Sequence, residues 1–209
     1  MDKSQHAAAV FHKLANLYQD KFMNVDMYGD TFDFFCNSIA TPNAEVLELA
    51  CGPGNITKYL LNKRPDFKIL GTDLAPNMLA LARINNPHAE FQLMDCRDIA
   101  RLNKQFDAIM CGFCLPYLSK EETQTLIRDA SLLLKPNSVL YISTMEDDYS
   151  KSGPKKGSTG DEIYIHYHEA TYLTDFLTKN GFTVLDLQRK DFPNTDGTIT
   201  TDLILIAQK

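Results

Sequence analysis

A short apolar segment that runs into a glycine-rich turn is the feature that most constrains the fold of this chain. The segment VLELACGPGNIT covers residues 46–57. Its apolar beginning predicts a buried strand, and the spacing of apolar residues after the glycines predicts a helix. A strand, a tight turn and a helix in this order are typical of a doubly wound α/β sheet, which binds a ligand at the carboxyl end of its first strand.

Two glycines define the predicted turn. Gly52 and Gly54 allow tight backbone angles and a close ligand approach, which a Cβ atom would prevent. The following helix offers free backbone N–H groups to an anion. The third small residue of the G-x-G-x-x-G dinucleotide fingerprint is missing, because Thr57 stands there. Glu48 lies inside the strand, where its carboxylate can face a cationic ligand group.

An acidic residue ends each of the next two predicted strands. Asp73 lies about 20 residues beyond the glycine turn, the separation at which an acidic side chain meets a ribose in such sheets. A carboxylate suits this role because it can accept hydrogen bonds from both ribose hydroxyls. Asp95 ends a third strand that begins at Phe91. Alone, Asp95 is better explained as a turn cap, but its register with the glycine turn and Asp73 favours ligand contact.

In these residues the chain resembles the class I S-adenosylmethionine-dependent methyltransferases. The segment ELACGPG, residues 48–54, is similar to the family's first motif, an acidic residue followed by a Gly-x-Gly turn. The family often carries glycine where this chain has Ala50. The resemblance implies an α/β fold with a doubly wound, mostly parallel seven-stranded sheet whose last strand is antiparallel. It also implies S-adenosylmethionine as the cofactor and a methyl-accepting substrate.

The resemblance assigns cofactor contacts to particular positions. It implies that Asp73 holds the ribose hydroxyls, that Asp95 accepts from the adenine amino group, and that the N–H of Cys96 meets a ring nitrogen. Residues 106–119 resemble the family's fourth motif, which lies under the methionine part of the cofactor and faces the acceptor. The expected cofactor-binding residues are Glu48, Ala50, Gly52, Gly54, Asn55, Asp73, Leu74, Met78, Asp95, Cys96 and Cys111.

Composition limits the class of partner. The chain has 209 residues, of which 44% are hydrophobic and 23% charged, as in ordinary globular proteins. A net charge of −6 without a basic stripe disfavours nucleic acid. No apolar run approaches the roughly 20 residues that span a bilayer, and the first residues do not resemble a signal peptide. We therefore expect a cytoplasmic protein with no membrane partner, and the sequence indicates no particular oligomeric state.

The five cysteines do not form a framework typical of secreted proteins. Cys111 and Cys114 have the C-x-x-C spacing of a redox pair. Redox pairs of this kind open a helix, whereas Pro116 follows here and the next helix is predicted to begin later. We expect both cysteines to pack as small apolar residues.

The chain is predicted to form a single methyltransferase domain over residues 1–209. Apolar residues at helical spacing predict a helical cap over residues 1–43, before a cofactor-binding core over residues 44–209. Residues 145–168 form an unusually long connection, which predicts a lid. Cap and lid are expected to meet above the carboxyl ends of the strands and to enclose a small polar acceptor.

The residues that contact the acceptor are less well defined. The catalytic candidates are Tyr18, Tyr117, His166 and His168, and further candidates for the pocket are Tyr28, Tyr149 and Tyr164. His166 and His168 share a face if they lie on a strand. No third metal ligand is identifiable, so no metal is predicted. His168 alternatively stands at the start of the following helix. The methylated atom and the need for a general base stay open.

Two other functions share part of this pattern. A nicotinamide-dependent oxidoreductase has the same strand, turn and ribose-binding acid. It is disfavoured by Thr57 in place of the third glycine and by Glu48, which would lie near a pyrophosphate. A regulator that binds S-adenosylmethionine without catalysis would have the same sequence features. The methyltransferase is favoured, and in that reaction catalysis consists mainly of holding donor and acceptor in line.

Overall fold

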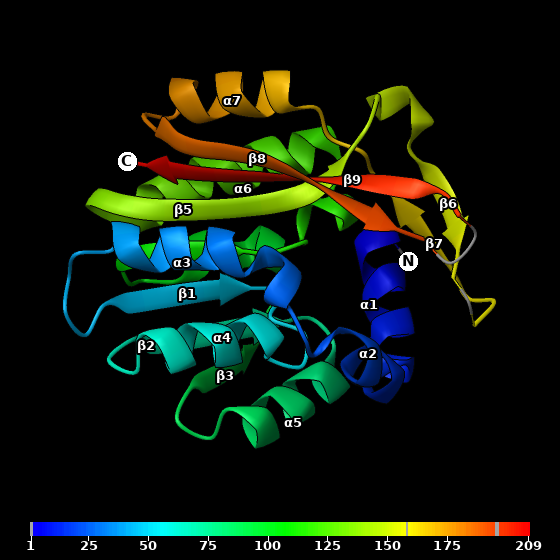
Figure 1. The fold of residues 1–209 in the computed structure, drawn as a ribbon, viewed down its shortest axis with the longest axis horizontal. Coiled ribbons are helices and arrows are strands. Elements are labelled where there is room, and N and C mark those ends of the chain that lie inside the picture. The colour runs from blue at the N-terminus through cyan, green and yellow to red at the C-terminus, as the bar shows by residue number, and fades with distance from the viewer. Residues whose placement is uncertain (1, 158, 195–196) are drawn as a thin grey trace.

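The computed structural model describes residues 2–157, 159–194 and 197–209. Its main sheet, as far as these residues show, has seven strands in the order β3-β2-β1-β4-β5-β9-β8 (Figure 1). The strands are β1 (Glu45–Leu49), β2 (Lys68–Asp73), β3 (Glu90–Leu93), β4 (Phe106–Cys111), β5 (Leu134–Glu146), β8 (Thr183–Pro193) and β9 (Ile199–Gln208). β1 to β5 pair in parallel, whereas β9 is antiparallel to both of its neighbours. The predicted doubly wound sheet with an antiparallel last strand is confirmed.

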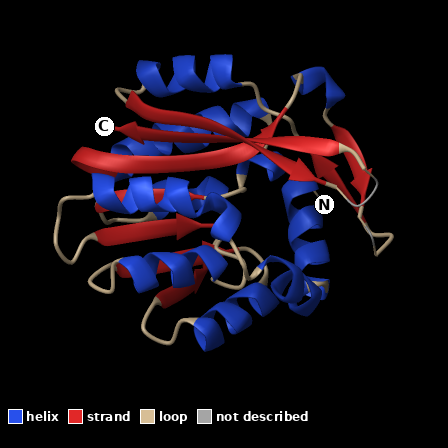
Figure 2. Ribbon diagram, in the orientation of Figure 1, coloured by secondary structure: helices blue, strands red, loops and turns tan. Residues whose placement is uncertain are grey.

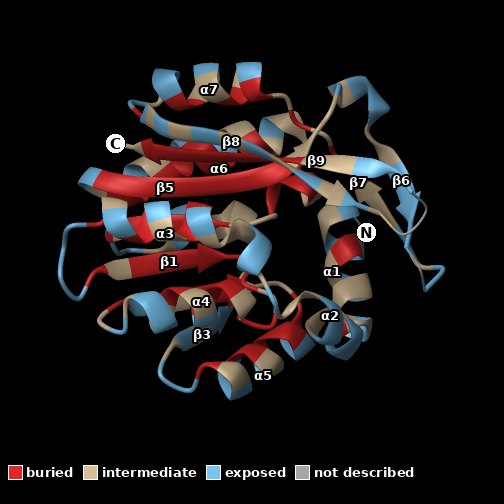
Figure 3. Ribbon diagram, in the orientation of Figure 1, coloured by how far each residue is buried: buried red, intermediate tan, exposed pale blue. Residues whose placement is uncertain are grey.

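Helices cover both faces of the sheet (Figure 2). They are α1 (Lys3–Lys13), α2 (Ala15–Phe22), α3 (Gly29–Ser38), α4 (Asn55–Lys63), α5 (Pro76–Asn85), α6 (Lys120–Leu133) and α7 (Ala170–Lys179). One apolar core packs α6 and α7 against the sheet, and a second packs α3 and α4 against the opposite face. The central strands are therefore buried on both sides (Figure 3), as expected for parallel strands between helix layers. None of the described helices is both long and apolar enough to cross a membrane.

Local sequence explains where several elements begin. Ser119 and Glu122 form a capping box, so that α6 starts with its first N–H groups bonded. Pro76 occupies the first turn of α5, where its missing N–H costs nothing. The sequence predicts a helix from Thr57, and α4 starts two residues earlier, directly at the end of the glycine turn.

The sequence predicts two final strands over residues 182–189 and 202–209, and both are longer in the structure. β8 continues to Pro193 and β9 begins at Ile199, because the ladder of paired residues extends into the predicted connection. Residues 195–196 of that connection lie outside the described part of the chain. The longer ladder carries the amino-terminal end of β9 beyond the sheet core, toward α1 and the 3-10 helix Asp26–Tyr28.

A two-stranded hairpin stands apart from the main sheet. It consists of β6 (Gly153–Lys156) and β7 (Glu162–Ile165) and forms most of the region predicted as a lid, whose residue 158 lies outside the described ranges. The hairpin packs on α1: Lys13 pairs with Asp161 at 2.8 Å, and His6 Nε2 lies 2.9 Å from the carbonyl oxygen of Glu162. Cap and hairpin thus contact each other at the carboxyl ends of the parallel strands (Figure 1).

Candidate functional site

The two glycines of the turn after β1 have different structural roles. Both are in the left-handed region, with φ of 53° at Gly52 and 76° at Gly54. A Cβ atom on Gly52 would have one neighbour within 4 Å, the ring of Tyr18 at 3.8 Å. A Cβ atom on Gly54 would lie 2.4 Å from Asn86 Nδ2 and 3.3 Å from Ala82. Gly52 therefore leaves the turn open toward a cavity, whereas Gly54 allows α4 to approach α5.

Asp73 holds the glycine turn in place. Its carboxylate accepts a hydrogen bond from the N–H of Gly52 at 2.9 Å and another from the N–H of Ala75 at 2.8 Å. Burial raises the pKa of Asp73, although these backbone donors act in the opposite direction. The side chain thus connects the end of β2 to the turn after β1. Its predicted contact with a ribose stays a prediction, and the lone pairs that such a contact needs remain.

Glu48 lies beneath the turn rather than at a cavity wall. It is 1% exposed, and one carboxylate oxygen accepts a hydrogen bond from the Thr57 hydroxyl at 2.5 Å. The other oxygen, Oε1, has no partner among the described residues. Burial raises the pKa of Glu48 to about 8, against the lowering effect of Thr57. The structure therefore shows a buried acid with one unpaired oxygen where a carboxylate facing a ligand was expected.

Asp95 lines the same cavity as Asp73, and Arg97 holds its side chain in place. It accepts hydrogen bonds from the Arg97 backbone N–H at 2.9 Å and from Arg97 Nη2 at 2.6 Å. Arg97 also pairs with Glu122 at 2.9 Å and with Asp2 at 3.0 Å. This arginine ties α6 and the residue before α1 to the end of β3. The contact of Asp95 with an adenine stays a prediction.

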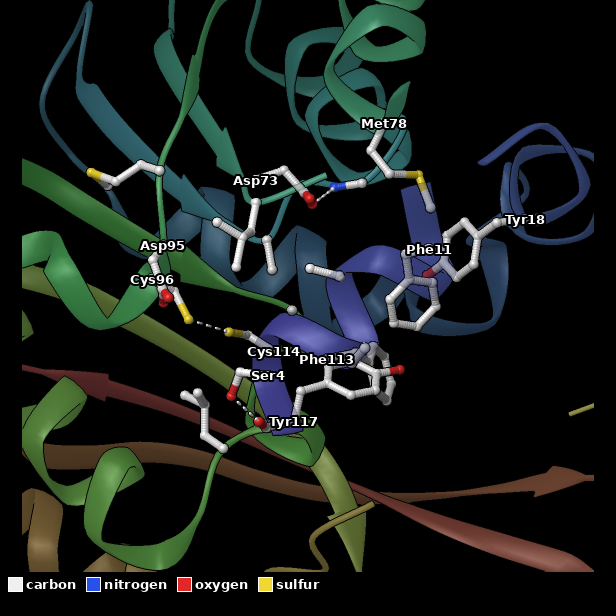
Figure 4. A pocket seen from close by; sticks show the side chains of 18 residues that line it. Ser4, Phe11, Tyr18, Asp73, Met78, Asp95, Cys96, Phe113, Cys114 and Tyr117 are labelled. Carbon is white, nitrogen blue, oxygen red and sulfur yellow. Dashed lines mark hydrogen bonds between the residues drawn. The ribbon is translucent and has the colours of Figure 1, made fainter. Parts of the chain in front are cut away.

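A cavity opens at the carboxyl ends of β1, β2 and β4, and we call it the cofactor cavity (Figure 4). Seven predicted cofactor-binding residues line it: Ala50, Gly52, Asp73, Leu74, Met78, Asp95 and Cys96. Asn55 lines a neighbouring cavity instead. Three predicted residues, Glu48, Gly54 and Cys111, line neither cavity in the described structure, because each is buried in the packing behind the turn or along β4.

Sequence reasoning missed the part that α1 takes in this wall. The α1 residues that line the cofactor cavity are Ser4, Ala7, Ala8 and Phe11. The Ser4 hydroxyl donates to the carbonyl oxygen of Tyr117 at 2.8 Å, and the Phe11 ring meets the Tyr117 ring edge-on at 5.1 Å (Figure 4). The helix is thereby held to the loop that follows β4. The run of small residues at 7–9 was a signal of close helix approach, but it did not indicate the partner surface.

A second, larger cavity of about 530 Å³ adjoins the first, and we call it the acceptor chamber. Seven residues line both cavities: Phe11, Tyr18, Ala50, Gly52, Gly112, Phe113 and Tyr117. Most other chamber residues are apolar, and the charged ones among the described residues are Lys21, Asp161 and Asp202. A concave, mostly apolar space with a few polar groups is typical of a small-molecule site. Neither Asp202 nor the contribution of β9 was predicted from the sequence.

The two predicted tyrosines, Tyr18 and Tyr117, line both cavities. Burial raises the pKa of Tyr18 to about 12 and raises that of Tyr117 still further. Their hydroxyls therefore stay protonated and can orient a ligand by donating hydrogen bonds. Tyr28 lines the acceptor chamber, whereas Tyr149 and Tyr164 line neither cavity in the described structure.

His166 and His168 do not reach either cavity. The backbone N–H of His166 donates to the carbonyl oxygen of Pro116 at 2.8 Å. The Nε2 of His168 bonds to the carbonyl oxygen of Leu115 at 2.9 Å, and its Nδ1 bonds to the Tyr172 hydroxyl. Burial lowers the pKa of His168 to about 4. Both residues hold the segment before α7 against the loop after β4, and the catalytic role predicted for them stays a prediction.

The cysteines pack as small apolar residues. Cys111 lies in the core, and the Cys114 thiol contacts both the Cys111 thiol and that of Cys96, with 3.3 Å between the sulfur atoms of Cys114 and Cys96. The hydrogen bond from Cys114, together with burial, raises the pKa of Cys96 well above its ordinary value. Across the described ranges, no three His, Cys, Asp or Glu side chains are grouped so that they could hold a metal ion.

Comparison with known proteins gives a family for the cofactor half of the chain. Residues 46–137 match a family described as "Methyltransferase domain". Over 99 residues, 47% of this chain and 38% of the relative, the sequence is 38% identical to trans-aconitate 2-methyltransferase of Variovorax paradoxus. The matched regions make up 35 to 38% of the length of the first three curated relatives, so this chain corresponds to well under two thirds of each.

Solved structures resemble nearly the whole chain. One is 1,6-didemethyltoxoflavin-N1-methyltransferase of Burkholderia thailandensis, solved with 1,6-didemethyltoxoflavin and S-adenosylhomocysteine. It is 20% identical, with a TM-score of 0.71 over 98% of this chain and 87% of that chain. Another is magnesium protoporphyrin IX methyltransferase of Synechocystis PCC 6803 with bound S-adenosylmethionine, 16% identical, with a TM-score of 0.72 over 100% and 98% of the two chains. At these identities the similarity establishes the fold.

Proposed function

We propose that this chain, which belongs to the class I S-adenosylmethionine-dependent methyltransferases, transfers the methyl group of its cofactor to a small-molecule acceptor. The observation that supports this most is that the cofactor cavity and the acceptor chamber adjoin each other and share lining residues. Gly52, Gly112 and Phe113 belong to both, so a donor bound on one side faces an acceptor on the other. Methyl transfer needs this adjacency because the two reactants must meet in line.

The residues of the cofactor cavity fit S-adenosylmethionine. Gly52 leaves the space that a Cβ atom would narrow, and the acids Asp73 and Asp95 lie where hydroxyl and amino groups need acceptors. The side chains of Leu74 and Met78 offer an apolar surface to a base. The unpaired Oε1 of Glu48 lies just behind the turn, where a positive charge nearby would lower the cost of its ionisation.

Bound S-adenosylmethionine supplies an electrophilic methyl group on a sulfonium, so the protein's contribution is mainly positioning and exclusion of water. Tyr18 and Tyr117 border both cavities and can donate hydrogen bonds to either ligand. α1 closes the cofactor cavity from one side, and the hairpin contributes Gly157, Thr159, Asp161 and Ile163 to the chamber wall. We propose that the hairpin is the lid that retains the acceptor.

The acceptor that fits the chamber has an apolar body and a few polar groups. The apolar wall residues supply most of the surface, with charges at Lys21, Asp161 and Asp202. The small polar acceptor expected from the sequence is thereby narrowed to one with an apolar body, since a uniformly polar molecule would bury polar groups without hydrogen-bond partners against this wall. The net charge of −6 disfavours nucleic acid as the acceptor.

The test begins with the cofactor and then searches for the acceptor. S-adenosylmethionine or S-adenosylhomocysteine should raise the melting temperature, since a ligand that binds the folded state stabilises it, and NAD should not. Incubation with S-adenosylmethionine and pooled metabolites should then yield a product heavier by one methyl group in the mass spectrum. Tight cofactor binding without transfer to any acceptor would indicate a regulator, and stabilisation by NAD alone would indicate an oxidoreductase.

A further inference from the structure

Asp202 is a buried acid inside the acceptor chamber that no ion pair explains. It lies near the start of β9, is 3% exposed and belongs to the chamber wall. The Tyr28 hydroxyl donates to its Oδ2 at 2.6 Å, and no other described side chain donates to this carboxylate. An ionised acid buried with one neutral donor is costly unless something else satisfies it.

The cation nearest in register is already paired with another acid. Lys190 on β8 lies opposite Asp202 in the ladder, but its ammonium pairs with Asp30 at 2.7 Å. The other chamber acid, Asp161, has Lys13 at 2.8 Å. Among the described residues, Asp202 forms no ion pair. Burial raises the pKa of Asp202 to about 6, against the lowering effect of Tyr28. Because this value is still below neutral pH, most Asp202 carboxyls are ionised at pH 7.

The carboxylate is connected through Tyr28 to a residue that lines both cavities. The ring of Tyr28, its hydrogen-bond donor, meets the ring of Phe113 edge-on at 5.1 Å. Phe113 lines both cavities and holds a left-handed backbone with φ of 53°, fixed by its N–H bond to Ser143 Oγ at 2.9 Å. Asp202, which has no ion pair among the described residues, therefore bonds to a tyrosine whose ring contacts the lining of both cavities. Acids with shifted pKa values in a cleft are candidates for function.

We propose that Asp202 binds the nitrogen of an amine acceptor with an apolar or aromatic body and takes a proton from it. This inference rests on the proposed methyl transfer. The acceptor enters as an ammonium, which gives one proton to the Asp202 carboxylate and thereby gains a free lone pair. A bond forms from nitrogen to the methyl carbon while the sulfur–methyl bond breaks, and its electron pair stays on sulfur. The methylated ammonium leaves, and the proton on Asp202 passes to water.

The charges in the chamber favour an amine over an acid. A carboxylate or phosphate acceptor would bring a second negative charge next to Asp202. Lys21, the positive residue in the chamber wall, is exposed, and its ammonium lies over the Phe22 ring at 5.0 Å. An ammonium, by contrast, gains both a counterion and aromatic faces, and the apolar wall lowers its pKa toward that of the acid.

The test compares acceptors that differ only in their head group. Phenethylamine, phenethyl alcohol and 3-phenylpropanoate share a phenyl body, and matched sets with butyl and naphthyl bodies extend the series. Binding is measured with S-adenosylhomocysteine present, and turnover by its release from S-adenosylmethionine. In at least one set the amine should bind more than tenfold tighter than its alcohol and acid. A preference for acids or alcohols in every set, or no binding of any amine, would overturn the proposal.

Variants of Asp202 and Tyr28 test whether these residues cause the preference for amines. Asp202→Asn keeps an oxygen for Tyr28 but removes the charge, and should reduce amine affinity and turnover at least tenfold. Asp202→Glu should retain part of the turnover, although a purely structural role predicts the reverse because Asn is closer in size. Tyr28→Phe should narrow the preference for amines without abolishing it, because the carboxylate remains. Amine preference that survives in Asp202→Asn contradicts the proposal.

Controls separate this inference from the proposed function. Asp129 is also a buried acid, but it lies on α6 outside both cavities and pairs with Arg128 at 3.0 Å. Asp129→Asn should leave amine preference unchanged. S-adenosylhomocysteine affinity should stay within about twofold in all Asp202 variants. Normal cofactor binding with loss of amine preference supports the assignment, whereas a wild-type protein that binds no cofactor would count against methyl transfer itself.

Discussion

The cofactor cavity and the acceptor chamber share a wall but are built from different kinds of contact. The cofactor cavity depends on backbone geometry at the ends of consecutive strands, where Gly52 and Asp73 are joined by one hydrogen bond across 21 positions of sequence. The chamber depends on side chains from distant segments: Tyr28 and Asp202, which share a hydrogen bond, are 174 positions apart. Local geometry leaves a local pattern in the sequence, whereas a pocket assembled from distant segments does not.

The difference has a consequence for substitutions. In the cofactor half, the effect of a change should follow from backbone angles and from the space around a Cβ atom. In the chamber it should follow from charge and polarity, with little effect on the cofactor. The family match, residues 46–137, ends before the hairpin and β9, so most of the residues that line the acceptor chamber lie outside it.

The largest effect is expected from Gly54→Ala, compared with Gly52→Ala. Both add left-handed strain of about 1 kcal/mol. Only at Gly54 does the new Cβ meet Asn86 and Ala82, so overpacking should bring the total loss of unfolding free energy to about 3 kcal/mol. Gly52→Ala should instead weaken S-adenosylmethionine binding at least tenfold, because its Cβ points into open space at the cavity. Chemical denaturation and titration calorimetry of both variants measure these effects.

This pair corrects what the motif alone predicts. From the sequence, both glycines were expected to make room for the cofactor, so that a larger residue at Gly54 would abolish binding in a folded protein. The structure assigns Gly54 to helix packing. Equal stability of the two variants, or loss of cofactor affinity in a stable Gly54→Ala protein, would mean that the two glycines share one role after all.

The next effect is expected from Asp73→Ala. Loss of the carboxylate should weaken cofactor binding by about 1.5 to 3 kcal/mol, the scale of a charge-assisted hydrogen bond. The sequence predicts little change in stability, but the N–H groups of Gly52 and Ala75 would lose their acceptor, at a cost of about 1 to 3 kcal/mol. Asp73→Asn keeps one acceptor oxygen and should fall between. Unchanged cofactor affinity in Asp73→Ala would remove the ribose assignment.

The sequence could predict the sheet, the turn and the acids at strand ends because each depends on residues close together in the chain. Strand, glycine turn and helix are set by local periodicity and by backbone freedom. The role of a single polar residue depends on its neighbours in space, which periodicity does not contain. The sequence favoured His166, His168 and Glu48 as site residues because their spatial neighbours were not visible in it. Their partners, Leu115, Pro116 and Thr57, bury them away from the cavities.

Asp202 is a residue that the sequence did not single out, although the structure places it in the acceptor chamber. It stands in the segment TTDLILIAQK, where a single acid before an apolar strand looks like an ordinary strand boundary. Its burial follows from pairing with Met145 on β5 and from Tyr28, which the 3-10 helix before α3 brings within hydrogen-bond distance of the Asp202 carboxylate. No feature of the sequence near position 202 indicates this contact.

A smaller effect, dependent on pH, is expected from Glu48→Gln. The pKa of Glu48 is about 8 in the folded protein and 4.5 in an exposed carboxyl, so the folded state binds the proton more tightly. The stability that this gives is complete below pH 4.5 and is lost as pH rises through 8, by at most about 1.4 kcal/mol per pH unit. Gln carries no such proton. The variant should therefore gain stability relative to wild type between pH 5 and pH 8.

Denaturation curves at pH 5, 6.5 and 8 measure this change. A difference between Glu48→Gln and wild type that stays constant across this range would show that Glu48 ionises in the folded protein as it does in water. Glu48 would then behave as a solvated acid, and its burial beneath the glycine turn would not affect its ionisation.

The smallest effect is expected from Ala50→Gly, at the point where the two cavities meet. Ala50 has φ of 51°, a left-handed backbone that costs a residue with a Cβ about 1 kcal/mol. Glycine removes this strain but makes the unfolded chain more flexible, so the net gain in unfolding free energy should be below about 1 kcal/mol.

Ala108→Gly is the control, because Ala108 is buried within β4 and does not have a positive φ. It should lose about 0.5 to 1 kcal/mol, and more for its buried methyl group. If both variants lose stability alike, backbone strain does not distinguish the turn from the strands beside it. If only Ala50→Gly gains, the residue that departs from the family's usual glycine carries the strain, and the turn keeps its shape at that cost because Asp73 holds it from the next strand.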